Sequence, residues 1–107
     1  MNVWFYTTRG GKNVIKEFIN HLPIYEKAEG MAIIEGLEEN GIPYLDILNT
    51  RQLDRKLWEI KFYRHNRIMY VLMDDDNIYL LHACKKQKGK AETFELNKAK
   101  KRALEVE

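Results

Sequence analysis

The hydrophobic positions along the chain change their spacing several times, and these changes predict the order of the secondary-structure elements. Residues 2–7 are rich in β-branched and aromatic side chains and predict a first strand. In residues 12–22 the apolar residues recur at intervals of three and four, which is typical of one face of a helix. These apolar residues are Val14, Ile15, Phe18, Ile19 and Leu22. The sequence therefore predicts a strand followed by a helix.

A second helix is predicted after Pro23, because proline fits the first turn of a helix, where its missing N–H costs nothing. Residues 40–43 (NGIP) should end this helix, with the glycine as its cap and the proline preventing continuation. Gly30 and Gly36 are expected to weaken it by up to about 1 kcal/mol each relative to alanine. Its expected buried stripe consists of Ile24, Ala28, Met31, Ala32 and Leu37.

The second half of the chain predicts a sheet and a final helix. Residues 44–56 are less regular and predict a loop with a short edge strand. Three strands follow at 57–63, 67–73 and 77–84, and the turns between them are short enough for antiparallel hairpins. Residues 92–106 predict a helix with Leu96, Ala99, Ala103 and Val106 on one side. The expected fold class is α+β: a single domain over 1–107 in the order β-α-α-β-β-β-β-α, with an antiparallel sheet covered by helices on one face only.

The strand alternation places charged residues together on the uncovered face. A three-residue turn at 64–66 would pair Tyr63 with Arg67 and Lys61 with Met69, and the apolar side chains of these strands would then share the opposite face. If the next turn has an even number of residues, His82 lies opposite Met69; an odd number would move His82 to the core face. On the even alternative, the exposed surface carries Glu59, Lys61, Tyr63, Arg67 and His82, with Lys85, Lys86, Lys88 and Lys90 at its rim.

Composition narrows the classes of function. The chain of 107 residues is 45% hydrophobic and 32% charged, and no apolar run approaches the roughly 20 residues that cross a bilayer. Cys84 is the single cysteine and no secretory signal is visible at the N-terminus, so we expect a cytoplasmic protein without an internal disulfide. The formal net charge of +2 is uneven, because residues 85–107 hold eight basic against four acidic residues, a net of +4. A basic segment of this kind favours phosphate-bearing partners.

Cations beside an imidazole, a phenol and a carboxylate are the groups that RNA phosphodiester cleavage requires. The 2′-hydroxyl loses a proton as it attacks phosphorus, the non-bridging oxygens gain charge, and the leaving 5′-oxygen gains a proton. No metal or other cofactor is needed, and Asp74–Asp76 is more typical of a solvated turn than of a cation site. Simpler readings stay open: Lys61 and Glu59 as an ordinary surface pair, and His82 as a structural histidine.

Four segments resemble one known family: LWEIKF, RIMYVL, IYLLHACKKQKGK and KAKKRALE. In this order and spacing they resemble the HigB branch of the RelE-like toxin superfamily, the phage-derived toxins of type II toxin–antitoxin modules. The resemblance implies a microbial-RNase-like fold that cuts messenger RNA in the ribosomal A site, in contact with ribosomal RNA. It also implies neutralisation by a HigA-like helix-turn-helix antitoxin. A non-catalytic RNA- or protein-binding module of phage origin is the alternative.

Matching positions carry the family's roles onto particular residues of this chain. The resemblance assigns Lys61 and Arg67 to transition-state phosphate contacts, and Arg51 to a basic position near the same backbone. The basic turn comprises Lys85, Lys86, Lys88 and Lys90. The resemblance assigns Lys86 and Lys90 to RNA binding, and the basic run itself adds Lys85 and Lys88 as RNA-binding candidates. His82 and Tyr63 are the acid–base candidates from the strand register. The chain departs from its relatives in three places: lysine replaces the commoner arginine at position 61, Ala91–Glu92 replaces Thr-Pro, and the last residues lack a histidine or tyrosine.

Overall fold

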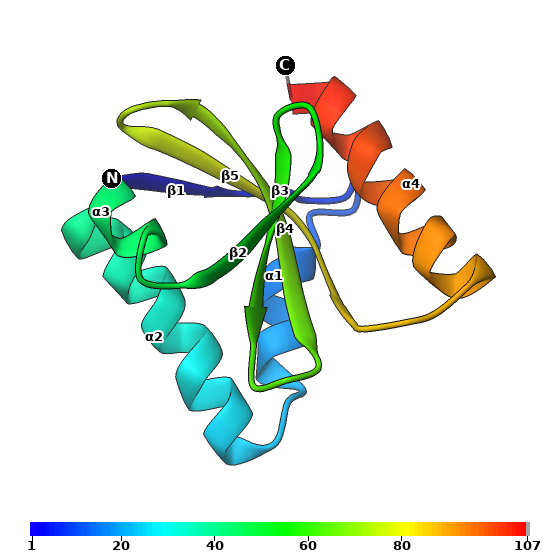
Figure 1. The fold of residues 1–107 in the computed structure, drawn as a ribbon, viewed down its shortest axis with the longest axis horizontal. Helices are drawn as coiled ribbons and strands as arrows, with labels where there is room; N and C mark the ends of the chain where they lie inside the picture. Colours follow the sequence, from blue (N-terminus) through cyan, green and yellow to red (C-terminus); the bar gives the residue numbers. More distant parts are fainter. Residues whose placement is uncertain (107) are drawn as a thin grey trace.

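The computed structural model describes residues 1–106, which form one five-stranded sheet and four helices (Figure 1). The strands are β1 (Asn2–Phe5), β2 (Asn49–Asp54), β3 (Leu57–Phe62), β4 (Asn66–Asp74) and β5 (Asn77–Lys85). The helices are α1 (Val14–Asn20), α2 (Ile24–Asn40), α3 (Ile42–Leu45) and α4 (Lys90–Val106). The predicted α+β class and element order are confirmed, with α3 as an additional short helix. No helix within 1–106 is both long and apolar enough to cross a membrane.

The strands lie in the order β1-β5-β4-β3-β2, and the sheet is only partly antiparallel. Strands β2 to β5 form the predicted meander, with β2 as the edge strand expected within 44–56. β1 instead pairs with β5 in parallel, Asn2 lying opposite Asn77. The prediction of a wholly antiparallel sheet is therefore wrong, because hairpin spacing carries no information about a strand whose partner lies far away in the sequence.

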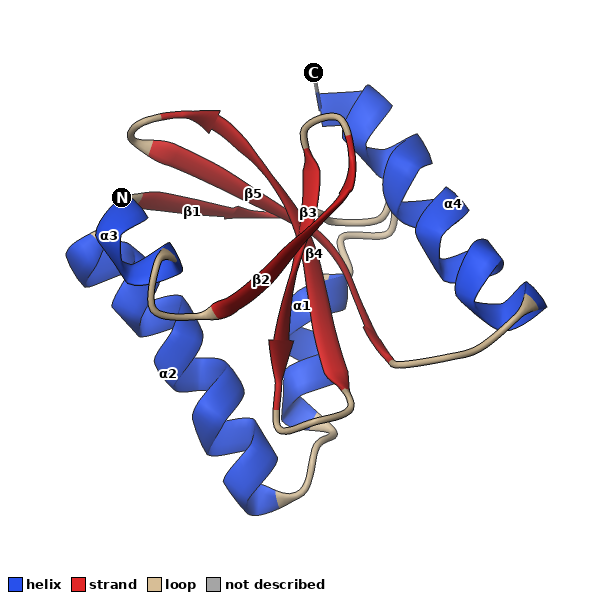
Figure 2. Cartoon of the chain, viewed as in Figure 1, coloured by secondary structure: helices blue, strands red, loops and turns tan. Residues whose placement is uncertain are grey.

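One face of the sheet is covered by α1 and α2, as Figure 2 shows. The side chain of Asn13 caps α1 by accepting a hydrogen bond from the backbone N–H of Lys16 at 3.0 Å. The helices and strands then bury a common apolar core. Its members include Ile15, Ile19, Ile33, Leu37, Ile60, Phe62, Ile68, Tyr70, Ile78 and Leu80.

Helix α2 buries Leu37 as predicted, but the rest of its buried stripe differs from the predicted one. Its buried residues are Gly30, Ile33, Gly36 and Leu37, whereas Ile24 and Met31 are 76% and 47% exposed. A Cβ on Gly36 would lie 2.2 Å from Cζ of Tyr44, so the Tyr44 ring occupies the space that a side chain would need. Glycine here lets α3 approach α2 closely, and the helix turns its glycine side inward.

Helix α4 covers the other face of the sheet, on the side away from α1 and α2 (Figure 1). This face was predicted to be free, and that prediction is wrong. The strands carry apolar residues there as well, and the predicted apolar side of α4 packs onto them. The second core comprises Leu57, Met69, Val71, Leu81, Cys84, Ala99 and Ala103.

The strand register differs from the predicted one at the first hairpin. At the second, the predicted pairing of Met73 with Ile78 is wrong, because Ile78 lies opposite Leu72, and only the pairing of Met69 with His82 agrees. In β3 and β4, Lys61 pairs with Arg67, so the turn is residues 63–65 rather than 64–66. A shift of two residues keeps each side chain on its predicted face. In β4 and β5, Met69 pairs with His82 as predicted, next to a register shift between Met69 and Tyr70.

Candidate functional site

Charged side chains from β2, β3, β4 and α4 meet on the α4 side of the sheet. We call Arg51, Glu59, Lys61, Arg67 and Glu92 the charged cluster. At its centre is Glu59, which is fully buried. One of its carboxylate oxygens accepts a hydrogen bond from Nε of Arg67, and the other lies 3.0 Å from Nη2 of Arg51 and 3.9 Å from Nζ of Lys61. A single buried carboxylate therefore lies within ion-pair distance of three cationic side chains.

Strand pairing explains why these side chains meet. Arg51 lies opposite Glu59 in the β2–β3 pair, and Lys61 lies opposite Arg67 in the β3–β4 pair. Residues directly opposite one another, and their diagonal neighbours, are within reach across a sheet. Glu92 approaches from the first turn of α4, with Oε1 3.6 Å from Nη1 of Arg67 and 4.0 Å from Nη2 of Arg51.

The members of the charged cluster differ in their access to solvent. The side chain of Arg67 is 2% exposed, that of Lys61 is 23% exposed and that of Arg51 is 51% exposed. Within residues 1–106, Nη1 of Arg67 and Oε1 of Glu59 are buried without a hydrogen-bond partner. The ion-pair contact between Arg51 and Glu59 thus lacks hydrogen-bond geometry. The arrangement holds Lys61 and Arg51 where they are partly exposed to solvent, and there they can stabilise an oxyanion that develops during a reaction.

His82 lies beneath α4 rather than on an exposed surface, so the predicted placement is wrong. It is 6% exposed, and both of its ring nitrogens have partners. Nη1 of Arg102 donates a hydrogen bond to Nδ1 at 2.9 Å, and Nε2 lies 2.6 Å from Oε2 of Glu95. Since arginine only donates, Nδ1 is the acceptor and Nε2 carries the proton. Burial lowers the pKa of His82, outweighing the opposing effect of Glu95, so the neutral ring is favoured.

His82, Cys84 and Glu95 form the one described group that resembles a metal site, with ligand atoms within 4.8 Å of one another among residues 1–106. This donor set suits zinc. A metal would need the lone pair of Nε2, which would move the ring proton to Nδ1, where it would face the guanidinium of Arg102. Burial raises the pKa of the Cys84 thiol to about 12, which disfavours the thiolate. The geometry therefore fits a neutral hydrogen-bond network better than a metal site.

Tyr63 lies in the β3–β4 turn and not in the strand. Its backbone has a φ of 48°, in the left-handed region, and its side chain is 45% exposed. It lines a cavity of 580 Å³ together with Glu26, Arg64, His65 and Lys85. Nζ of Lys85 lies 3.1 Å from Oε1 of Glu26 in α2. Hydrogen bonds from Asn66 and Lys85 lower the pKa of Glu26. Tyr63 and Lys85 thus line a cavity with α2, apart from the charged cluster.

The other lysines of the basic turn are exposed. Lys86 is tied to the β3–β4 turn, because its backbone N–H donates to the carbonyl oxygen of His65 at 2.7 Å. Lys88 precedes Gly89, whose φ of 62° turns the chain into α4, and Lys90 is the first residue of that helix. These side chains have the freedom to contact a polyanion next to the charged cluster.

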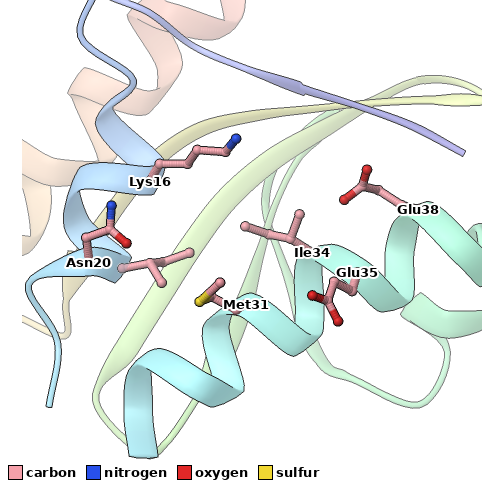
Figure 3. Close-up of a pocket in the computed structure, with 7 residues that line it drawn as sticks. Lys16, Asn20, Met31, Ile34, Glu35 and Glu38 are labelled. Carbon is pink, nitrogen blue, oxygen red and sulfur yellow. The ribbon is translucent and has the colours of Figure 1, made fainter. Parts of the chain in front are cut away.

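A separate groove of 280 Å³ runs between α1 and α2 (Figure 3). Figure 3 shows that α1 contributes Lys16 and Asn20, whereas Met31, Ile34, Glu35 and Glu38 come from α2. The groove combines an apolar floor with two acidic residues and one lysine.

Sequence reasoning missed the contribution of α4, namely Glu92, Glu95 and Arg102. A signal was present: Glu95 and Arg102 stand four before and three after Ala99, which belongs to the apolar side of the predicted helix. Charged residues bordering a buried stripe are expected to find partners on the surface that the stripe covers. The sequence pattern does not indicate that α4 packs on the same face of the sheet as the charged strand residues.

Comparison with known proteins supports the resemblance at the level of the family. No curated protein matches the chain. A family model described as phage derived protein Gp49-like (DUF891) matches residues 17–104, which run from within α1 to within α4 and include all strands except β1. The matched segment includes every member of the charged cluster. The chain therefore belongs to the phage-derived Gp49-like family, within the RelE/HigB-like group of toxins.

Proposed function

We propose that this protein is the toxin of a type II toxin–antitoxin pair and cuts messenger RNA in the ribosomal A site. In the proposed reaction the 2′-hydroxyl attacks phosphorus and the bond to the 5′-oxygen breaks. The products are a 2′,3′-cyclic phosphate and a 5′-hydroxyl end. The proton of the 2′-hydroxyl leaves to a base, and the departing oxygen takes up a proton, so no cofactor is consumed. Membership of the toxin group supports the proposal.

The observation that carries the proposal is the position of Lys61 beside Arg67. The two residues are direct partners across β3 and β4, and both contact the buried carboxylate of Glu59. Glu59 holds the guanidinium in one orientation, so little reorganisation is needed when charge develops on a phosphate. Lys61 remains 23% exposed and can meet the phosphate directly. Arg51 would neutralise an adjacent part of the RNA backbone.

The basic turn supplies the sequence-independent part of RNA binding in this proposal. Lys86, Lys88 and Lys90 would each neutralise a phosphate of messenger or ribosomal RNA and release condensed counterions. Lys85 would contribute less, because it is paired with Glu26. We therefore propose RNA contacts chiefly for the three lysines nearest α4.

The acid–base groups need a separate assignment. His82 is not used in the proposal, because both ring nitrogens are engaged with Glu95 and Arg102 beneath α4. Tyr63 is exposed, yet it lines a cavity with Glu26 rather than with Lys61. Lys61 is the partly exposed amine of the charged cluster next to the proposed phosphate position, and we propose it as the proton-transfer candidate to test first.

Growth arrest on induced expression tests the toxin assignment. Lys61→Met removes the charge of a partly exposed residue, and Lys56→Met makes the same change at the exposed β2–β3 turn. We expect the wild type and Lys56→Met to arrest growth and Lys61→Met to relieve the arrest at equal protein level. Arg67 is unsuitable as a first target, since its burial against Glu59 makes loss of folding an equal explanation. Arrest by a well-folded Lys61→Met variant would remove Lys61 from the mechanism.

A non-catalytic RNA- or protein-binding module is the second candidate. One observation favours it: the His82 imidazole, which the sequence suggests for proton transfer, is engaged by Glu95 and Arg102 rather than open to a substrate. In that case the basic turn would bind RNA without cleavage. Mapping of RNA ends after incubation with translating ribosomes separates the two, because only the nuclease creates new ends.

The family also suggests an antitoxin partner. We propose a HigA-like helix-turn-helix protein, encoded beside this chain. Co-expression with the neighbouring gene followed by purification through a tag on the toxin tests this. Recovery of both proteins in a fixed ratio supports the proposal, and recovery of the toxin alone at equal expression contradicts it.

A further inference from the structure

Glu92 places a carboxylate between two arginines of the charged cluster. Its Oε1 lies 3.6 Å from Nη1 of Arg67 and 4.0 Å from Nη2 of Arg51. These guanidinium groups come from β4 and β2, the strands on either side of β3, and the carboxylate comes from α4. A carboxylate oxygen of Glu92 therefore already lies between the guanidinium groups of Arg67 and Arg51.

The contact between Glu92 and Arg67 is incomplete as a hydrogen bond. Arg67 is 2% exposed, its Nε is engaged by Glu59, and within residues 1–106 its Nη1 has no hydrogen-bond partner. Burial of an unpaired guanidinium N–H is costly. An anion with two free oxygens, such as a phosphodiester, could approach both guanidinium groups and make the hydrogen bonds that Glu92 does not make.

Glu92 can leave this position without unfolding the helix. It is the third residue of α4, and its side chain is 40% exposed. Rotation about its side-chain bonds would carry the carboxylate into solvent while the backbone stays in place. The basic residues Lys88 and Lys90 lie just before it in the chain and would bring the polyanion to the same point.

We infer that the Glu92 carboxylate is a built-in competitor of the RNA phosphate for Arg67 and Arg51. This inference rests on the proposed function, because it concerns the regulation of the same site. The carboxylate occupies the phosphate position in the free protein, and the incoming phosphate must displace it. Glu92 thus lowers the affinity for RNA and limits binding to ligands that bring several phosphates to the basic turn.

A purely structural role for Glu92 makes different predictions. A carboxylate in the first turn of a helix interacts favourably with the helix dipole, whatever faces it across the sheet. On that account, replacement by glutamine weakens α4 and changes RNA affinity no more than any other single loss of negative charge. The control must therefore be a charge-matched change on the same helix.

The experiment compares Glu92→Gln with Glu105→Gln, at the far end of α4, where the carboxylate contacts Tyr6. Affinity for a short single-stranded RNA with 2′-O-methyl groups, which cannot be cleaved by this route, is measured by fluorescence anisotropy at low and moderate salt. We expect Glu92→Gln to bind about fivefold to tenfold more tightly than the wild type and Glu105→Gln to differ by less than about twofold. Equal affinities of the two variants, or weaker binding by Glu92→Gln, would overturn the inference.

A second readout separates failure of this inference from failure of the proposed function. Inorganic phosphate is titrated while thermal unfolding is followed, since an anion that binds the folded state raises the midpoint. We expect a larger phosphate-dependent rise for Glu92→Gln than for Glu105→Gln, even if the protein cuts no RNA. Cleavage of RNA together with identical phosphate responses of the two variants would retain the nuclease and reject the competitor.

Discussion

Nη1 of Arg102 donates a hydrogen bond to Nδ1 of His82 across 2.9 Å, and this contact fixes the ring as neutral. Glu95 completes the network by accepting the proton of Nε2. Burial raises the pKa of Glu95, but the hydrogen bonds from His82 and Cys84 outweigh that effect and the net direction is down. A neutral imidazole between a cation and an anion joins α4 to β5, which is a structural role.

Stability should fall on acidification because of His82. Its pKa is lowered by burial in the folded state, whereas the unfolded chain has an ordinary value of about 6.5. Below that value the unfolded state binds a proton that the native state does not. The free energy of unfolding therefore increases as pH rises and decreases as pH falls through this range. Urea unfolding of the wild type and His82→Gln from pH 5 to 8 measures this, and we expect a shallower slope in the variant. An unchanged slope would locate the pH sensitivity elsewhere.

Removal of the Glu59 charge should be strongly destabilising. Glu59→Gln leaves Arg67 buried without its main counter-ion, which typically costs about 3 to 5 kcal/mol. The matched control is Glu29→Gln on the exposed surface of α2, expected to change stability by less than about 0.5 kcal/mol. Chemical denaturation with equal m-values measures both. A loss below about 1 kcal/mol for Glu59→Gln would contradict the dependence of buried Arg67 on this carboxylate.

Gly36→Ala should destabilise the protein although alanine is the better helix former. The gain in helix propensity is about 1 kcal/mol, but the new methyl group would lie 2.2 Å from the Tyr44 ring and must displace it. We expect a net loss of about 1 to 3 kcal/mol. Combination with Tyr44→Ala should abolish this effect of Gly36→Ala, so a double-mutant cycle measures the clash. Additive effects would contradict the close approach.

The lysines of the basic turn should differ in their effect on RNA binding. Each phosphate contact contributes about −0.7 to the slope of log affinity against log salt for single strands. Lys90→Gln should therefore reduce that slope, whereas Lys85→Gln, whose side chain is paired with Glu26, should leave it nearly unchanged. Salt titrations of the uncleavable RNA give both values. Equal reductions in the two variants would place Lys85 in the same binding surface as Lys90.

The alternation of β3 and β4 was sufficient to assign their side chains to faces, whereas in β5 a register shift places Leu80 and His82 on opposite faces. Lys61 and Arg67 lie on the predicted face, and Met69 is opposite His82 as predicted. Hairpin spacing indicates whether the turn has an odd or an even number of residues more securely than it indicates the exact register. Lys61 therefore pairs with Arg67 rather than with Met69, a shift of two residues that leaves its side chain on the predicted face.

The covering of that face was not predicted. Leu57, Met69 and Val71 share it with Glu59 and are as apolar as the residues of the first core. A strand with apolar residues on both faces is expected to be buried on both. Charged residues in alternation with apolar ones are typical of a solvent-exposed face, so the pattern predicts neither the docking of α4 nor the burial of His82 and the contacts of Glu92.

End mapping of a defined messenger RNA on programmed ribosomes tests the central claim most directly. Purified wild type, Lys61→Met and Lys56→Met are added at equal concentration after equal thermal unfolding midpoints have been verified. We expect cuts confined to the A site with the wild type and Lys56→Met, and a rate at least about a hundredfold lower with Lys61→Met. No A-site cut with folded wild type, or equal cutting by Lys61→Met, would contradict the account.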